Sequence, residues 1–191
     1  MCILDISKTI MYKFHYDFIM KQYPRAKLLF TDTDSFCYDI PTNTNMYEDI
    51  KHRTDWFDFS NYDKNHPNYD TSNDLVPGKF KDEMGGKPIE EFVGLRAKMY
   101  SIKTHEGIGK KTAKGILKAV KDKCITHEHY KQCLFEEKQL KHKQTRIIQE
   151  NHNMFTATQN KTSLSPFNDK KWITREGDEF TTYSFGHYKL E

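Results

Sequence analysis

The sequence predicts an α+β fold in which a small antiparallel sheet packs with helices. Apolar residues recur every three or four positions over residues 5–22, which indicates an amphipathic helix. Shorter stretches that alternate apolar with polar residues indicate strands joined by hairpins. Of the 191 residues, 36% are hydrophobic and 14% aromatic, so the chain can build the core of one domain or of a closely joined pair.

The N-terminal helix and the hairpin that follows it are the clearest predicted elements. Pro24 ends the helix because proline removes a backbone donor and cannot continue the helical ladder. An apolar run at residues 26–30, which we expect to be buried, and an alternating run at residues 36–40 flank the segment TDTDS. Two such runs around a short polar segment predict a β-hairpin with an acidic tip.

The rest of the chain predicts short strands, loops and two further helices. We expect a helix at 46–52, followed by a loop rich in Asn and Asp to residue 74. Strands are expected near 79–83, 90–93 and 98–104, separated by Gly85-Gly86 and by Gly94, and then a turn at 105–111 and a strand at 112–116. The remaining predicted elements are a helix from the N-cap Thr126 to Phe135 with His129 at its third position, strands at 146–149 and 153–161, and a turn at 165–171. The aromatic tail gives no clear pattern.

Composition argues for an intracellular, soluble protein of undetermined compartment. Charged residues make up 30% of the chain, and no run of about 18 apolar residues suggests a membrane span. No signal peptide is recognisable at the N-terminus. The four cysteines form no CxxC pair, which favours reduced thiols. A zinc site could be drawn from Cys124, His127, His129 and Cys133, but all four lie in one short segment that predicts the start of a helix.

Charge is distributed unevenly along the chain. Residues 39–74 are predominantly acidic, whereas residues 96–123 carry many lysines and few acids. A basic stretch of this kind favours contact with a polyanion such as nucleic acid, although a solvated surface gives the same pattern.

Asp32 and Asp34 at the predicted hairpin tip are candidate metal ligands. Nucleotidyl transfer uses two magnesium ions about 3.5–4 Å apart, which activate the attacking hydroxyl and neutralise the triphosphate. Magnesium prefers hard oxygen ligands and keeps several waters, so each ion takes only one or two carboxylates. An acidic turn that merely solvates a hairpin is the alternative interpretation, since Asp is common in turns.

The segment Phe30–Ser35 (FTDTDS) resembles the third palm motif of family-B DNA polymerases, usually written YxDTDS. Phe30 replaces the usual Tyr, which loses the hydroxyl and keeps the ring. The resemblance implies a palm-type hairpin with a two-metal Mg²⁺ site. It assigns Asp34 as a principal ligand of both metals and Asp32 as a supporting residue.

Downstream, Lys98-x-Tyr100 in GLRAKMYS resembles the family's KxY motif, a strand that contacts the primer terminus. The similarity covers most of residues 3–190, is strongest from Leu4 to Ser101, and is to the viral, organellar and mobile-element branch, many members of which use a protein primer. It implies a DNA primer–template as partner and deoxynucleoside triphosphates as substrates of the complete enzyme. The candidate DNA-binding residues are Arg96, Lys98, Tyr100, Lys110, Lys111 and Lys114.

The resemblance also implies a partial palm over residues 1–105 and a thumb-like part over residues 106–191. The family's upstream aspartate motif, DxxSLYP, and its fingers motif, KxxxNSxYG, are absent from the chain. We therefore expect a C-terminal fragment of a DNA-directed DNA polymerase, inactive without a missing N-terminal polymerase portion.

Two other functions remain open. A non-catalytic nucleic-acid-binding relic of a mobile-element polymerase would keep the basic residues without using metal. A glycosyltransferase could use the DxD segment to bind a nucleotide-sugar through manganese, but it requires a βαβ region before the aspartates, for which the preceding residues leave no room.

Overall fold

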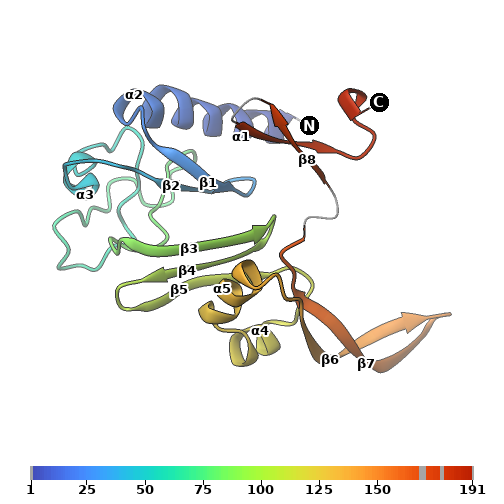
Figure 1. The fold of residues 1–191 in the computed structure, drawn as a ribbon. Coiled ribbons are helices and arrows are strands. Elements are labelled where there is room, and N and C mark those ends of the chain that lie inside the picture. The colour runs from blue at the N-terminus through green and yellow to red at the C-terminus, as the bar shows by residue number, and fades with distance from the viewer. Residues whose placement is uncertain (1, 168–170, 177–178, 191) are drawn as a thin grey trace. The chain divides into compact units, whose positions relative to one another are not determined.

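The computed structural model describes residues 2–167, 171–176 and 179–190. It combines helices with several small antiparallel sheets, which confirms the predicted α+β class (Figure 1). The chain divides into two compact units, a first unit that ends at Ile89 and a second unit that begins at Glu90. Within the described ranges, no helix is long and apolar enough to cross a membrane.

The first unit begins with the predicted helix and hairpin, both of which are confirmed. The helical segment comprises α1 (Cys2–Lys13), the π-helical turn η1 (Phe14–Ile19) and α2 (Met20–Gln22). The hairpin consists of β1 (Lys27–Thr31) and β2 (Phe36–Asp39), and the short helix α3 (Met46–Asp49) follows it. The wider turn of a π-helix brings residues four and five apart onto one side, which buries Phe14, Phe18 and Ile19 together.

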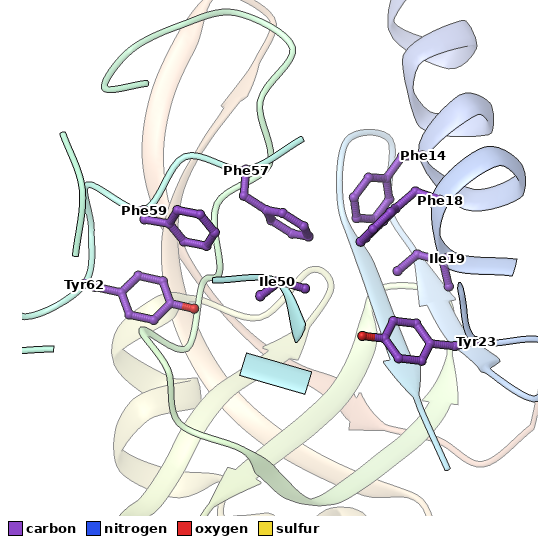
Figure 2. Close-up of a cluster of buried hydrophobic side chains, with 8 residues drawn as sticks. All are labelled: Phe14, Phe18, Ile19, Tyr23, Ile50, Phe57, Phe59 and Tyr62. Atoms are coloured by element: carbon purple, nitrogen blue, oxygen red, sulfur yellow. The ribbon is translucent and has the colours of Figure 1, made fainter. Parts of the chain in front are cut away.

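Aromatic side chains build the core of the first unit (Figure 2). Phe14 is 5% exposed and lies among the rings of Phe18, Trp56 and Phe57, with centroid distances of 5.4–5.7 Å. The ring of Phe80 stacks on it with a centroid distance of 3.9 Å. Aromatic pairs in such arrangements stabilise a core beyond the area they bury. The buried members of this aromatic cluster are Phe14, Phe18, Ile19, Tyr23, Ile50, Phe57, Phe59 and Tyr62.

The acidic residues after the hairpin mainly order their own loop. Asp58, Asp63, Asp70 and Asp82 each accept a hydrogen bond from the backbone N–H two residues further on, at 2.8–2.9 Å. These are local turns in which the carboxylate replaces a backbone acceptor. Asp58 is also buried and pairs with the Lys81 ammonium at 3.1 Å. The acidic stretch is thus largely structural.

The second unit contains a three-stranded antiparallel sheet covered by helices. Its strands are β3 (Ile89–Arg96), β4 (Met99–Thr104) and β5 (Gly107–Ala113), in the order β3-β4-β5. The helices are α4 (Lys118–Cys124) and α5 (His127–Phe135). The capping box between Thr126 and His129 confirms the predicted start of α5. The core cluster consists of Val93, Met99, Ala113, Ile125, Tyr130, Cys133 and Leu164.

Two separate hairpins complete the second unit. Strands β6 (Leu140–Glu150) and β7 (Asn153–Leu164) form a long two-stranded ribbon. Leu164, at the end of β7, packs in the core of the second unit. Most of the other side chains of the ribbon are exposed. Strands β8 (Lys171–Glu176) and β9 (Glu179–Ser184) pair with each other, and a 3₁₀ turn, η2 (Tyr188–Leu190), follows.

Several predicted strand positions are corrected. Gly94 lies inside β3, and the turn between β3 and β4 is formed by Ala97 and Lys98. Residues 79–83 contribute only an isolated bridge from Phe80 to Phe57. The strand predicted at 112–116 is β5, which begins earlier, because the turn before it is confined to residues 105–106.

The expected burial of the first hairpin strand is wrong. Leu28 and Leu29 in β1 are 41% and 37% exposed. The predicted turn at 165–171 lies partly outside the described residues. The chain divides into its compact units after residue 89, because the KxY strand β4 pairs with both β3 and β5 and so belongs with the second unit. The palm part over 1–105 and the thumb-like part over 106–191 stay a prediction.

Candidate functional site

The acidic tip of the β1–β2 hairpin is a strained turn. The Asp32 N–H donates to the Ser35 C=O at 3.1 Å, and the Asp34 N–H donates back to the Asp32 C=O at 2.7 Å. The second bond spans only three residues and holds Thr33 at a φ of 62°. For a β-branched residue this backbone conformation costs about 1–3 kcal/mol. The strained residue lies directly between the two candidate metal ligands.

The two carboxylates have the chemistry of a magnesium site. Both provide hard oxygen donors, which this cation prefers. Asp34 is exposed and Asp32 is half-buried, so an ion at Asp34 could retain most of its water. No group of three or more His, Cys, Asp or Glu residues gathers into a metal-binding arrangement within the described part of the chain. Magnesium commonly keeps several waters and takes only one or two carboxylates, a donor set that Asp32 and Asp34 match.

Strands β1 and β2 pair antiparallel around these aspartates. A nucleotide-sugar site of the glycosyltransferase type requires a parallel βαβ arrangement before its DxD segment. The observed hairpin gives that alternative no support.

Lys98 occupies the turn between β3 and β4 rather than a strand. It adopts a φ of 59°, which is uncommon for a residue other than glycine. The Lys114 N–H, just after β5, donates to the Lys98 C=O at 3.1 Å. Lys98 and Lys114 are both exposed, so the sheet presents two ammonium-bearing residues at the same end. Arg96, the last residue of β3, is half-buried beside this turn.

Tyr100 is a core residue in this structure. It lies on β4, is 6% exposed, and its ring is 6.1 Å from that of Phe92. Stacking of this ring on a nucleotide therefore requires movement of its neighbours. Of the two residues in the KxY motif, only Lys98 offers its side chain to solvent.

The three lysines predicted around β5 lie in different environments. Lys110 and Lys111 pair across the sheet with Ile102 and Ser101 respectively. The Lys111 ammonium donates to the carbonyls of Asp122 and Ile125 at 3.2 and 2.6 Å. A cation there neutralises the C-terminal end of α4, which carries partial negative charge. The Lys111 ammonium therefore has a structural role at the end of α4, whereas Lys114 is exposed to solvent.

Sequence reasoning missed a lysine that the fold brings to the same region. Residues 113–116 form a turn closed by the hydrogen bond from the Ile116 N–H to the Ala113 C=O at 3.2 Å. Gly115 has a φ of 88° in this turn, and the Lys161 Nζ lies 2.8 Å from where its Cβ would be. Lys161 belongs to β7, far from Gly115 in the sequence, so no local sequence pattern indicated that the two residues lie close together.

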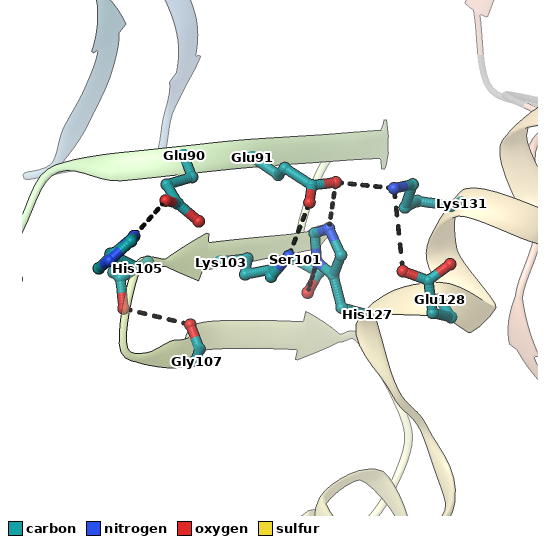
Figure 3. A network of polar contacts seen from close by, with 10 residues as sticks. Glu90, Glu91, Ser101, Lys103, His105, Gly107, His127, Glu128 and Lys131 are labelled. Atoms are coloured by element: carbon teal, nitrogen blue, oxygen red, sulfur yellow. Dashed lines mark hydrogen bonds and ion pairs between the residues drawn. The ribbon is translucent and has the colours of Figure 1, made fainter.

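A second polar cluster surrounds Glu91 on β3 (Figure 3). Its carboxylate accepts hydrogen bonds at 2.8 Å from the ammonium groups of Lys103 on β4 and Lys131 on α5. These bonds, Lys103 first, lower the pKa of Glu91 to about 2. The Nε2 of the buried His127 lies 3.5 Å from the same carboxylate, and the His127 Nδ1 contacts the Ser101 hydroxyl at 2.8 Å.

The Ser101–His127–Glu91 sequence of contacts has the residue types of a hydrolase triad. Ser101 is 0% exposed, however, and so no substrate can reach its hydroxyl. Nucleophilic catalysis needs an accessible nucleophile beside its base. The cluster instead ties α5 to the sheet.

Three of the four residues of the possible zinc site have structural roles. His127 contacts Ser101, and the side chain of His129 accepts the Thr126 N–H in the capping box. Cys133 is buried in the core of the second unit, whereas Cys124 is exposed at the end of α4.

The candidate residues thus fall into two groups. Asp32 and Asp34 belong to the first unit, and all the predicted DNA-binding residues belong to the second. Comparison of the chain with protein-family models, curated proteins and solved structures finds no match.

Proposed function

We propose that the chain is the palm and thumb part of a family-B-type DNA polymerase, which carries out DNA-templated nucleotidyl transfer by a two-metal mechanism. Asp34 acts as a metal ligand with support from Asp32, and Lys98 contacts the primer strand. The remaining metal ligand and the nucleotide-binding residues of such an enzyme belong to the upstream aspartate motif and the fingers motif, which this sequence does not contain. The observation that carries the proposal is the strained Thr33 turn, which holds both aspartates of the DTDS motif on a hairpin.

The turn supports metal chemistry for a physical reason. Backbone strain persists where neighbouring structure fixes it, and such residues are frequent at functional sites. Asp32 and Asp34 are two residues apart on a hydrogen-bonded turn, which limits how far their carboxylates can move apart. A cation that binds both carboxylates requires them to stay close together. The magnesium ions, when bound, would activate the primer hydroxyl and stabilise the charge on the triphosphate.

The second unit supports the nucleic-acid part of the proposal. Lys98 and Lys114 are exposed at one end of the sheet, where ammonium groups can contact phosphates without reading sequence. Lys110 and Arg96 are half-buried in the same sheet, Arg96 next to this end and Lys110 further along β5. The fixed position of Lys111 at the end of α4 gives this sheet and its helix a rigid connection.

Two binding measurements test the proposal. Fluorescence anisotropy should show that Lys98→Ala binds a labelled primer–template more weakly than the wild type does. The slope of log affinity against log salt concentration should be smaller by about 0.9, and the loss of affinity should depend little on the DNA sequence. Electron paramagnetic resonance with Mn²⁺ should show weaker ion binding by Asp34→Asn. Matched controls are Lys138→Ala, whose ammonium pairs with Glu136 at 2.6 Å, and Asp39→Asn, an exposed carboxylate on the same hairpin. Variants indistinguishable from these controls would refute the proposal.

The nucleic-acid-binding relic is a second candidate, favoured by the separation of the two residue groups. Because the basic residues all belong to the second unit, their contact with nucleic acid does not require the aspartates of the first. This function is supported if Lys98→Ala weakens duplex binding while Asp32→Asn and Asp34→Asn leave Mn²⁺ binding unchanged.

A further inference from the structure

Lys161 is held against the turn that follows β5. Its Nζ and Cε lie 2.8 and 3.3 Å from the position that a Cβ at residue 115 would occupy. Real Cβ contacts of 2.8 Å are essentially absent from proteins, so a side chain at residue 115 would push the flexible end of Lys161 away from this turn. Gly115 also has a φ of 88°, which favours glycine independently. The turn thus accepts the lysine side chain where any other residue would displace it.

Gln144 fixes the ribbon to the same turn. It is 3% exposed, and its Oε1 accepts the Leu117 N–H at 3.0 Å while its Nε2 donates to the Gly115 C=O at 3.2 Å. Both ends of the amide are therefore used. Lys161 pairs with His142 two residues before Gln144, so Lys161 and Gln144 share the face of the ribbon that contacts the turn. The backbone position of Lys161 is consequently set by the ribbon, and its side chain reaches the turn at Gly115.

The ammonium of Lys161 has no acidic partner in the described part of the chain, although the residue is half-buried. Lys114 precedes Gly115 directly, and its N–H is bonded to the Lys98 C=O at 3.1 Å. Three segments therefore bring lysines together: the β3–β4 turn, the exit from β5, and β7. These lysines add positive charge to one end of the sheet, which favours the binding of an anion there.

We infer that Lys161 binds a backbone phosphate of nucleic acid together with Lys98 and Lys114, and that Gly115 and Gln144 position it. The ligand class is a phosphodiester, because lysine ammonium groups act as point charges toward phosphate and carry no base preference. This inference rests on the proposed function and extends the contact surface from the sheet to the ribbon.

The test compares charge-removing variants in duplex binding at several salt concentrations. Lys161→Ala should lower affinity for a labelled primer–template about threefold to tenfold and reduce the salt slope by about 0.9, as expected for one lost phosphate contact. Lys138→Ala removes the same charge from an exposed residue already paired with Glu136 and should change neither quantity. Circular dichroism of each variant checks that the fold is retained.

A double-mutant cycle tests the role of Gly115. Gly115→Ala should weaken binding, and adding Lys161→Ala should cause little further loss, because both changes remove the same contact. Full additivity would overturn the positioning role. If Lys98→Ala and Lys114→Ala weaken binding but Lys161→Ala matches Lys138→Ala, the inference fails and the proposed function stands. If all three behave like Lys138→Ala, both fail.

Discussion

Phe14→Ala should destabilise the first unit severely. The ring is 5% exposed and contacts the rings of Phe18, Trp56, Phe57 and Phe80. Buried Phe→Ala substitutions cost about 3–5 kcal/mol because they remove apolar contacts and leave a cavity. We expect the upper part of this range, since four rings lose a partner and a cluster of rigid aromatic side chains collapses poorly into the gap.

That loss is large compared with the stability of a domain. Folded domains are typically stable by about 5–15 kcal/mol in total. Phe14→Ala should therefore leave the first unit only marginally folded at room temperature. Phe14→Leu keeps most of the apolar volume but also removes the ring contacts, so it should cost clearly less than Phe14→Ala.

The two tryptophans allow the measurement to be made on one unit. Trp56 lies 5.7 Å from Phe14 between ring centroids, whereas Trp172 belongs to β8 in the second unit. In a Trp172→Phe background, Trp56 fluorescence during urea titration reports the first unit alone. The matched control is Tyr12→Ala on α1, whose side chain is 62% exposed and whose loss should change stability by less than about 0.5 kcal/mol. A cost for Phe14→Ala below about 1.5 kcal/mol would show that the aromatic cluster is not packed as described.

Three further substitutions test the turn, the polar cluster and the ribbon anchor. Thr33→Gly removes the Cβ from a residue with a φ of 62°, which relieves backbone strain but also raises the entropy of the unfolded chain. The net effect should be a stabilisation of the first unit by about 0.5–1 kcal/mol, measured by thermal unfolding. A lower stability of the variant would argue against strain at Thr33. The pKa of Glu91 is depressed to about 2 from 4.5, so its contribution is fully present above pH 4.5 and disappears as the pH falls toward 2. The urea midpoints of the wild type and Glu91→Gln should therefore converge on acidification, and a constant difference would contradict this. Gln144→Leu leaves the Leu117 N–H and the Gly115 C=O without partners and should cost about 2–4 kcal/mol by urea unfolding, whereas a cost under about 0.5 kcal/mol would mean that water replaces the amide.

Local signals in the sequence predicted the elements that local physics determines. Pro24 marked the end of the first helix, and Thr126 with His129 marked the start of α5. The alternation around TDTDS gave the β1–β2 hairpin. The π-turn at residues 14–19 could not be foreseen, because packing of the aromatic cluster selects it over a regular α-helix of the same composition.

Misplaced elements have equally specific causes. Gly94 suggested a break between strands, but it lies within β3. The turn instead contains Lys98, which adopts a positive φ that is more typical of glycine and so gives no signal in the sequence. Strands β6 and β7 exceed their predicted lengths because the outer ribbon is exposed on both faces and lacks the usual alternation. The contact between Lys161 and Gly115 depends on docking of the ribbon, which local sequence patterns do not encode.

The candidate site was predictable only in part. The sequence placed Asp32 and Asp34 at the tip of a hairpin, as observed, but it placed Lys98 in a strand rather than in the turn before β4. It did not indicate that Tyr100 is buried or that Lys111 is bonded to the end of α4. Those outcomes depend on which face of each strand the helices cover, and this is decided by tertiary packing.

Iron-directed cleavage of bound DNA tests the proposed joint action of the two units most directly. Fe²⁺ replaces Mg²⁺ at carboxylate sites, and with ascorbate and peroxide it generates hydroxyl radicals that cut only nearby nucleic acid. On an end-labelled primer–template we expect cuts confined to a few nucleotides around the primer 3′ end, abolished by Asp34→Asn and retained by Asp39→Asn. Lys98→Ala should reduce cutting in proportion to lost binding. Cuts spread evenly along the duplex, or cuts at the primer end that persist in Asp34→Asn, would contradict a metal at Asp34 beside the primer.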